Sequence, residues 1–223
     1  MKNSKLTLTA FDWVPDFAQG HVRDLRVRWA LEEAGFPYEV EVMAQGAQRA
    51  PAHLRRQPFG QIPTLEIDGL SLFESGAILW RIAEADDALL PADIAARSRV
   101  LSWVFGALNS LEPPIGMLAT LDLFIEDKDA AARIRPEVVR AVQGKLKRLA
   151  EALGPDPHIA GSFSVADILL TTVLRDVPDD LLAGFPSLQA YVERHTARPA
   201  FSAALEGQMR PFAENAARYE KAS

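Results

Sequence analysis

The hydrophobic pattern of this chain changes its period once, near residue 85. Before that point, residues 6–10 and 38–42 alternate apolar and polar side chains, and a helical pattern over residues 22–34 separates them. After it, apolar residues recur every three or four positions, and no convincing strand is visible. The order strand, helix, strand favours a parallel pairing of the first two strands. We therefore predict a small α/β domain followed by an all-helical one.

The stretch GQIPTLEIDGLSLFES, residues 60–75, predicts a β-hairpin that leads into a helix. Asp68-Gly69 separates two short alternating runs, and a two-residue hairpin turn requires positive φ, which these residues tolerate. A helical pattern starts at Ser75. Pro63 stands where the first strand of the hairpin begins, although proline cannot donate to a strand ladder.

The second half of the chain predicts long helices with recognisable ends. We expect one helix over residues 100–111, which Pro113-Pro114 would end or sharply kink, and one over residues 134–153. Residues 185–201 predict a further amphipathic helix. The region between residues 84 and 93 is acidic, contains a proline and has the composition of a linker.

Ser164 and Asp167 are spaced as in a capping box, just before an apolar helical run. In that motif the two side chains bond to each other's backbone N–H groups. We interpret both residues as folding determinants and not as catalytic groups.

Composition excludes several kinds of site. The net charge of −6 argues against general binding to nucleic acid or anionic membranes, and no apolar run approaches the ~20 residues of a membrane span. The chain has no cysteine, which excludes disulfides, thiolate metal sites and a protein thiol nucleophile. No metal-ligand spacing is found among the histidines, which are His21, His53, His158 and His195. We therefore predict no metal site. A cytoplasmic protein is the default expectation.

Five segments of the chain, taken together in their order along the sequence, resemble the glutathione transferase superfamily. They are ALEEAGFPYEV (30–40), PFGQIPTLEIDGLSLFESGAILWRIAE (58–84), LLPAD (89–93), SVAD (164–167) and FPSLQAYVERHTARPAF (185–201). The resemblance covers almost the whole chain. It implies a thioredoxin-like domain over residues 1–85, a linker over 86–93 and an all-helical domain over 94–223. It also implies glutathione as co-substrate, no metal, and a homodimer.

The same resemblance implies how glutathione is held. The Ile62-Pro63 bond is expected to be cis, with the Ile62 backbone pairing with the cysteinyl part of the peptide, while Glu74 and Ser75 hold its γ-glutamyl end. Gln61 belongs to the same loop, and Gln48, or Arg49 beside it, is a candidate for the glycyl carboxylate. Taken one at a time, these residues have plainer interpretations: Pro63 on an edge strand, Ser75 as a helix cap, and Glu74 as a charge near the helix dipole.

The residue that activates the thiol is not obvious. The family commonly places Tyr, Ser or Cys after the first strand, but this chain has none of them between Phe11 and Tyr38. We predict Arg23 and His21 as candidates, because a cation or a hydrogen-bond donor near a helix start favours a thiolate. Gln19 and the backbone amides of residues 20–22 stay open, and Arg23 and His21 have plain alternatives as solvated residues.

A hydrophobic pocket for a second substrate is expected from six residues: Trp13, Val14, Trp103, Ala107, Leu111 and Pro114. Ordinary core packing is the alternative, above all for Trp103 and Leu111.

Two functional hypotheses follow. The first is a glutathione transferase that conjugates the glutathione thiolate to a small hydrophobic electrophile. The second is a glutathione-binding or protein-interaction module with little or no transferase activity. The retained QIP and ES motifs favour the enzyme, because a scaffold has no need of a glutathione cradle.

Overall fold

The computed structural model describes residues 1–220, and its contacts divide the chain into two compact units. The first unit contains residues 1–90 and the C-terminal segment that starts at Ala197, and the second contains residues 91–196. We describe each unit by itself.

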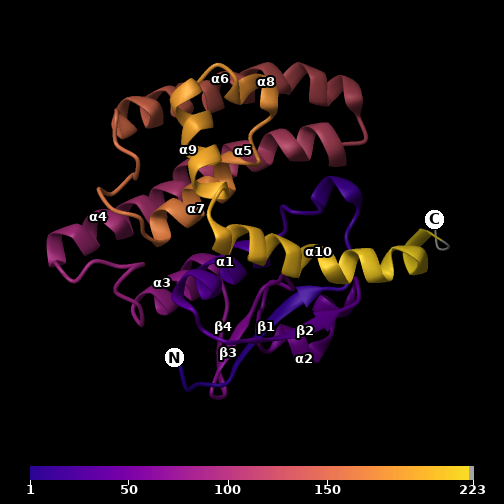
Figure 1. Ribbon diagram of the computed structural model, residues 1–223. Coiled ribbons are helices and arrows are strands. Elements are labelled where there is room, and N and C mark those ends of the chain that lie inside the picture. Colours follow the sequence, from indigo (N-terminus) through magenta and orange to yellow (C-terminus); the bar gives the residue numbers. More distant parts are fainter. Residues whose placement is uncertain (221–223) are drawn as a thin grey trace. The chain divides into compact units, whose positions relative to one another are not determined.

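The first unit is built on a four-stranded sheet in the order β2-β1-β3-β4 (Figure 1). The strands are β1 (Leu6–Phe11), β2 (Glu39–Met43), β3 (Leu65–Ile67) and β4 (Leu70–Leu72). β1 pairs in parallel with β2 and antiparallel with β3, and β3 pairs antiparallel with β4. The predicted parallel pair and hairpin are therefore confirmed.

The hairpin turn has the predicted backbone geometry. Asp68 has φ 50° and Gly69 has φ 88°, so both turn residues are left-handed, as a tight two-residue turn demands. After the turn, β4 runs antiparallel to β3, and the next helix begins at Ser75. The turn thereby sets the distance between Pro63 and Ser75.

Three helices of the first unit lie on one side of the sheet: α1 (Asp24–Ala34), α3 (Ser75–Ala83) and α10 (Pro199–Glu220) (Figure 1). α1 packs against both α3 and α10, and its Val27 and Trp29 are completely buried. Shorter elements complete the unit: η1 (Asp16–Ala18), η2 (Ala47–Arg49) and α2 (Pro51–Leu54).

The C-terminal helix differs from the prediction for residues 185–201. The chain forms two helices there, α9 (Pro186–Thr196) and α10, because Pro199 starts a new helix at a position that needs no N–H donor. α10 is held to α1 by an edge-to-face contact between Trp29 and Phe201, with ring centroids 5.0 Å apart. The Arg198 guanidinium also donates to both carboxylate oxygens of Glu33. The first compact unit therefore includes α10, which the family resemblance assigns to the 94–223 domain.

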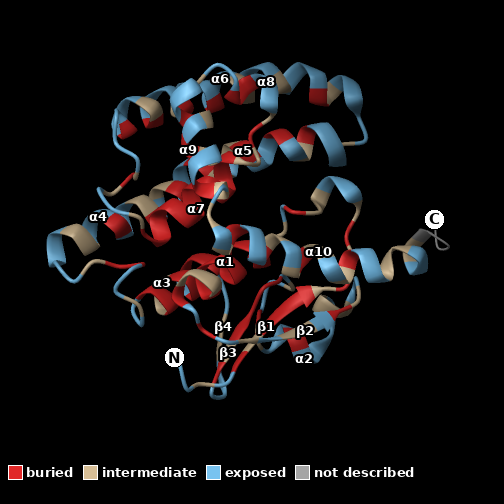
Figure 2. Ribbon diagram, in the orientation of Figure 1, coloured by how far each residue is buried: buried red, intermediate tan, exposed pale blue. Residues whose placement is uncertain are grey.

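The described part of the second unit is helical throughout. Its α-helices are α4 (Ile94–Phe105), α5 (Glu112–Ala119), α6 (Lys128–Leu153), α7 (Val165–Leu174), α8 (Asp179–Leu182) and α9. Figure 2 shows α7 as the buried centre, and all ten of its residues are buried. None of the helices described here is both long and apolar enough to cross a membrane.

Pro113-Pro114 does not end the helix, contrary to one of the two expected outcomes. The chain passes from α4 into a π-helical stretch, η3 (Gly106–Leu111), and then into α5, which carries the prolines near its start. The π-helical stretch directly ahead of the prolines changes the hydrogen-bond pattern, and the chain stays helical across them. A second π-helical stretch, η4 (Thr120–Phe124), follows α5.

The capping box at the start of α7 is confirmed. The Ser164 backbone N–H donates to Asp167 Oδ2 at 2.9 Å, and the Ser164 hydroxyl donates to the same oxygen at 3.1 Å. Both residues are completely buried. The motif therefore closes the N-terminal end of the most buried helix in the second unit.

Candidate functional site

The loop before β3 presents the backbone of one residue. The Ile62-Pro63 peptide bond is cis, and among the described residues the N–H and C=O of Ile62 have no hydrogen-bond partner. Thr64, the residue after Pro63, is firmly anchored to β1. Its N–H donates to Thr9 Oγ1 at 2.7 Å, and the Thr9 N–H donates to Thr64 O at 3.0 Å. Ile62 is thus an available donor and acceptor pair beside a fixed strand.

A buried histidine holds the backbone of the residue before Ile62. His53 is 1% exposed, and its Nε2 lies 2.7 Å from the backbone oxygen of Gln61. A carbonyl only accepts, so Nε2 carries the proton. Gln57 Oε1 accepts from the backbone N–H groups of Phe59 (2.6 Å) and Gln61 (3.3 Å). His53 was not predicted as a positioning residue, because its hydrogen-bond partner is a backbone atom that no side-chain pattern reveals.

We expect His53→Leu to loosen the loop, since the substitution keeps an apolar volume but leaves the Gln61 carbonyl without its donor. The free energy of unfolding should fall by about 1–2 kcal/mol, and the Thr64 amide should exchange faster with deuterium. His53→Gln keeps a hydrogen-bond donor, so its free energy of unfolding should fall by less. Unchanged Thr64 exchange in His53→Leu would contradict the assignment.

Glu74 and Ser75 join the hairpin to α3 with an unusual backbone. Glu74 has φ 65° and ψ 114°, a conformation that non-glycine residues rarely adopt and that occurs at ligand clamps. The Glu74 side chain is exposed, while Ser75 is buried as the first residue of α3. The N-terminal N–H groups and the positive end of the dipole of α3 therefore lie next to an exposed carboxylate.

A buried arginine adds positive charge behind this helix start. Arg26 on α1 is 2% exposed, and its Nη1 donates to Ser75 Oγ at 3.3 Å. The site thus combines an anion-favouring helix end, a guanidinium and, one residue away, a carboxylate suited to a cation. Arg26 was not among the predicted site residues. Its spacing of four from Val22 and three from Trp29 places it on the apolar face of α1 and was the available signal.

The thiol-activating candidates lie at the start of α1. Arg23 directly precedes the helix, and both Arg23 and His21 are exposed. Gln19 is occupied locally, because its amide nitrogen donates to the Val14 carbonyl and to Asp16, both at 3.1 Å. Arg23 and His21 therefore remain the predicted candidates, and the backbone amides of residues 20–22 stay open.

The loop after β1 is held by the C-terminal helix. The Trp13 and Tyr219 rings stack with centroids 4.7 Å apart, and the Tyr219 hydroxyl donates to Asp12 Oδ1 at 2.8 Å. Burial and this carboxylate raise the pKa of Tyr219, so the phenol stays a donor. A cavity of about 500 Å³ opens beside the loop, and its apolar lining includes Trp13, Phe17, Met209 and Phe212. The contribution of α10 to this lining was not predicted.

The other predicted pocket residues have mixed environments. Val14, in the first unit, is buried. In the second unit Ala107 and Leu111 are buried, which fits core packing, while Trp103 and Pro114 are half-buried. The six-residue pocket remains a prediction.

The two glutamines differ in their surroundings. Gln61 is exposed, whereas Gln48 is half-buried and its Oε1 accepts from the Gly46 N–H at 2.7 Å. Only the amide nitrogen of Gln48 is thus open to the predicted carboxylate contact.

Known proteins are similar to this chain in sequence and in fold. Residues 7–84 match the model of the glutathione S-transferase N-terminal domain. Disulfide-bond oxidoreductase YfcG of Escherichia coli is 32% identical over 193 residues, which cover 78% of this chain and 86% of that protein. Glutathione S-transferase 4 of Zea mays is 29% identical over 186 residues, covering 78% of this chain and 83% of the maize protein.

A solved structure agrees with these matches. A glutathione transferase from Burkholderia graminis, solved with two glutathione molecules bound per subunit, superposes with a TM-score of 0.80 at 27% identity. The superposition covers 91% of this chain and 88% of that one. With a thioredoxin-like sheet, a cis-proline loop and a helical second unit in place, this chain belongs to the glutathione transferase superfamily.

Proposed function

We propose that the first unit binds glutathione between the Ile62 loop and the start of α3. The Ile62 N–H and C=O would pair with the cysteinyl residue as an added strand, and Ser75 with the α3 N-terminus would take the γ-glutamyl carboxylate. Glu74 would pair with the α-ammonium group. The observation that carries this proposal is the exposed Glu74 carboxylate, held at φ 65° directly beside the Ser75–Arg26 contact.

We expect Glu74→Gln to weaken glutathione binding by about tenfold, because the amide keeps the size but removes the partner of the ammonium group. Isothermal titration calorimetry measures the affinity, and Asp87→Asn, an exposed acidic residue in the segment after α3, is the matched control. Deamino-glutathione, which lacks the ammonium group, should bind wild type and Glu74→Gln equally. An equal loss for both peptides would refute the pairing.

We further propose that the enzyme conjugates the glutathione thiolate to a small hydrophobic electrophile. Lowering a thiol pKa by about two units takes ~2.7 kcal/mol of preferential thiolate stabilisation. The start of α1, with its helix dipole and Arg23, is placed to supply part of it. Holding the thiolate beside the electrophile would then speed the bond-forming step through proximity. The apolar cavity beside Trp13 has the size and lining for such an acceptor.

Arg23→Ala should raise the pKa of bound glutathione, measured by titrating thiolate absorbance in the ultraviolet. A rise of about one unit corresponds to ~1.4 kcal/mol of lost stabilisation. Arg55→Ala removes an exposed arginine at the end of α2 and should change nothing. An unchanged pKa in Arg23→Ala removes Arg23 from the mechanism and leaves His21 and the backbone amides as candidates.

A binding module without transferase activity is the second candidate, favoured by the missing Tyr, Ser or Cys after β1. Turnover of an aryl halide such as 1-chloro-2,4-dinitrobenzene distinguishes the two. The relative from Escherichia coli carries the name of a disulfide-bond oxidoreductase. In this chain any such reaction would run between glutathione and its substrate, because no cysteine is present to form a mixed disulfide with the protein.

We also propose a cytoplasmic homodimer, as the family resemblance implies. Light scattering coupled to gel filtration measures the mass directly, and a mass near the 24.5 kDa of one chain would refute the dimer.

A further inference from the structure

The strand β2 forms a free edge of the sheet in the first unit. It is the outermost strand, and its neighbour in the sheet is β1 (Figure 1). The Met43 carbonyl accepts from the Asp12 N–H at 2.8 Å, so the backbone of Met43 faces β1. The backbone groups of successive strand residues point to opposite sides. The N–H and C=O groups of Val40 and Val42 therefore point away from β1, and no described residue bonds to them.

This edge lacks the features that commonly protect the edge of a sheet. Natural sheets protect their edges with very short strands, with lysine or proline, or with bulges. The opposite edge follows this rule, because β4 has only three residues. β2 has five residues with the sequence EVEVM, and its Val42 is 49% exposed. The β2 edge is therefore suited to pair with a further strand.

A groove of about 790 Å³ opens along the same edge, with walls from α1, β2 and α10. Val40 and Val42, whose backbone groups are free, also line the groove with their side chains, together with Leu31 and Phe36. Successive side chains of a strand point to opposite faces of the sheet. A strand added to β2 would therefore direct every second side chain into the groove.

The accessible charge of the groove is negative. The Arg28 side chain is only 3% exposed and is paired within α1. Arg210 is balanced by Glu206, whose Oε1 lies 3.6 Å from the Arg210 Nη2. Two further lining residues are Glu32 and Glu214, and neither forms an ion pair with a described residue. A cationic side chain that enters the groove would thus meet two carboxylates without partners.

One of these carboxylates is held in position. The Tyr38 hydroxyl donates to Glu32 Oε1 at 3.0 Å. Burial raises the pKa of Tyr38 to about 12, so the phenol stays a donor. The other oxygen of Glu32 is left to accept from a group outside the chain.

We propose that the β2 edge and its groove bind an extended, basic segment of a partner protein by strand addition. The partner's backbone would pair with Val40 and Val42, and its alternate side chains would enter the groove. Arginine or lysine fits there, because the aliphatic stem covers the two valines while the charged end meets Glu32 or Glu214. The proposed glutathione site adjoins β3 and the end of β4, on the other side of β1, so the two sites are distinct.

Titration of ¹⁵N-labelled protein with the peptide RVRVRVR, acetylated and amidated at its ends, tests the proposal by NMR. We expect saturable binding that slows hydrogen exchange of the Val40 and Val42 amides, because both would become hydrogen-bonded. The peptide EVEVEVE should bind about tenfold more weakly, since it brings carboxylates to Glu32 and Glu214. Excess glutathione should leave the affinity for RVRVRVR unchanged.

Two variants separate the backbone pairing from the charge. Val42→Pro removes an outward N–H that the pairing with β1 does not use, and it should weaken peptide binding about tenfold. Glu214→Gln removes one groove carboxylate at constant size and should weaken binding about fivefold. Glu126→Gln changes an exposed glutamate of the second unit and should bind as wild type. If circular dichroism shows that Val42→Pro does not fold, RVRVRVR with N-methylated valines tests the same hydrogen bonds on the wild type.

No saturable binding of RVRVRVR, or equal binding of EVEVEVE, would overturn the proposal. Unchanged affinity in a folded Val42→Pro, or for the N-methylated peptide, would do the same for the strand pairing. Competition by glutathione would place the peptide in the proposed glutathione site instead. Slower exchange of the Val40 and Val42 amides on raising the protein concentration alone would assign the edge to a second copy of this chain, and would also overturn the proposal.

Discussion

Asp167→Ala is expected to lower the free energy of unfolding of the helical unit by about 3–5 kcal/mol. The carboxylate is completely buried and accepts from four donors: the N–H groups of Ile159 and Ser164, the Ser164 hydroxyl and the Tyr191 hydroxyl. Each buried donor left without an acceptor costs about 1–3 kcal/mol, and a lost helix cap alone costs about 1 kcal/mol. The substitution therefore removes the centre of a network that joins α7 to α9.

Native-state hydrogen exchange of the α7 amides measures this loss within the second unit and does not assume that both units unfold together. Tyr191→Phe removes only one of the four donors and should cost about 1–2 kcal/mol. Asp156→Ala changes an exposed aspartate just after α6 and should stay within about 0.5 kcal/mol of wild type. A loss below about 1 kcal/mol in Asp167→Ala would contradict the central role of this carboxylate.

The fold was largely predictable because its signals are local. Alternation marked β1 and β2, Asp68-Gly69 marked the hairpin, and the Ser164–Asp167 spacing marked the start of α7. Each of these signals depends on residues within a few positions of one another. The helix over Pro113-Pro114 was predicted less well, because the π-helical stretch ahead of the prolines changes the hydrogen-bond pattern in a way that proline positions do not reveal.

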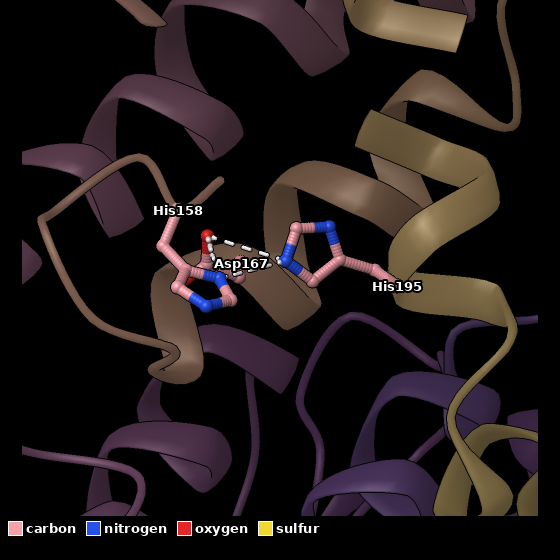
Figure 3. A group of neighbouring side chains, drawn as sticks. All are labelled: His158, Asp167 and His195. Atoms are coloured by element: carbon pink, nitrogen blue, oxygen red, sulfur yellow. Dashed lines mark hydrogen bonds and ion pairs between the residues drawn. The ribbon is translucent and has the colours of Figure 1, made fainter. Parts of the chain in front are cut away.

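The backbone geometry of the candidate site was predictable, whereas the side chains that support it were not. Glu74 and Ser75 follow a hairpin at a fixed distance, so their position could be read from the sequence. His53 and Arg26 act through partners 8 and 49 residues away, and in the second unit the meeting of His158 with His195 spans 37 residues (Figure 3). Periodicity shows which side chains are buried, but it does not show which partner from another element each of them meets.

Arg28→Met should destabilise the first unit by about 3–5 kcal/mol, because it leaves a buried carboxylate without its cation. Arg28 and Asp24 are one helical turn apart on α1, both nearly inaccessible, with Arg28 Nε donating to Asp24 Oδ2 at 2.7 Å. Gln208 of α10 donates to Asp24 Oδ1 at 2.6 Å and to the Val22 carbonyl at 3.0 Å. The pair therefore also fixes the start of α1 to the C-terminal helix. Urea unfolding, with α1 amide exchange as a local readout, measures the loss.

The pH dependence of the stability loss in Arg28→Met distinguishes an uncompensated charge from lost packing of the arginine stem. Burial raises the pKa of Asp24 above its ordinary 3.8, whereas Arg28 acts to lower it, so Arg28→Met should raise the folded-state pKa further. A carboxyl whose folded-state pKa exceeds its unfolded-state pKa keeps its proton to higher pH in the folded state. Its contribution to stability is fully present below the unfolded-state pKa and is lost as pH rises through the folded-state pKa. The deficit of Arg28→Met should thus be larger at pH ~8 than at pH ~5. Asp24→Asn/Arg28→Met removes both charges and should recover most of the stability at either pH. A deficit that does not change with pH, or no recovery in the double variant, would assign the loss to packing of the arginine stem instead of to the uncompensated charge.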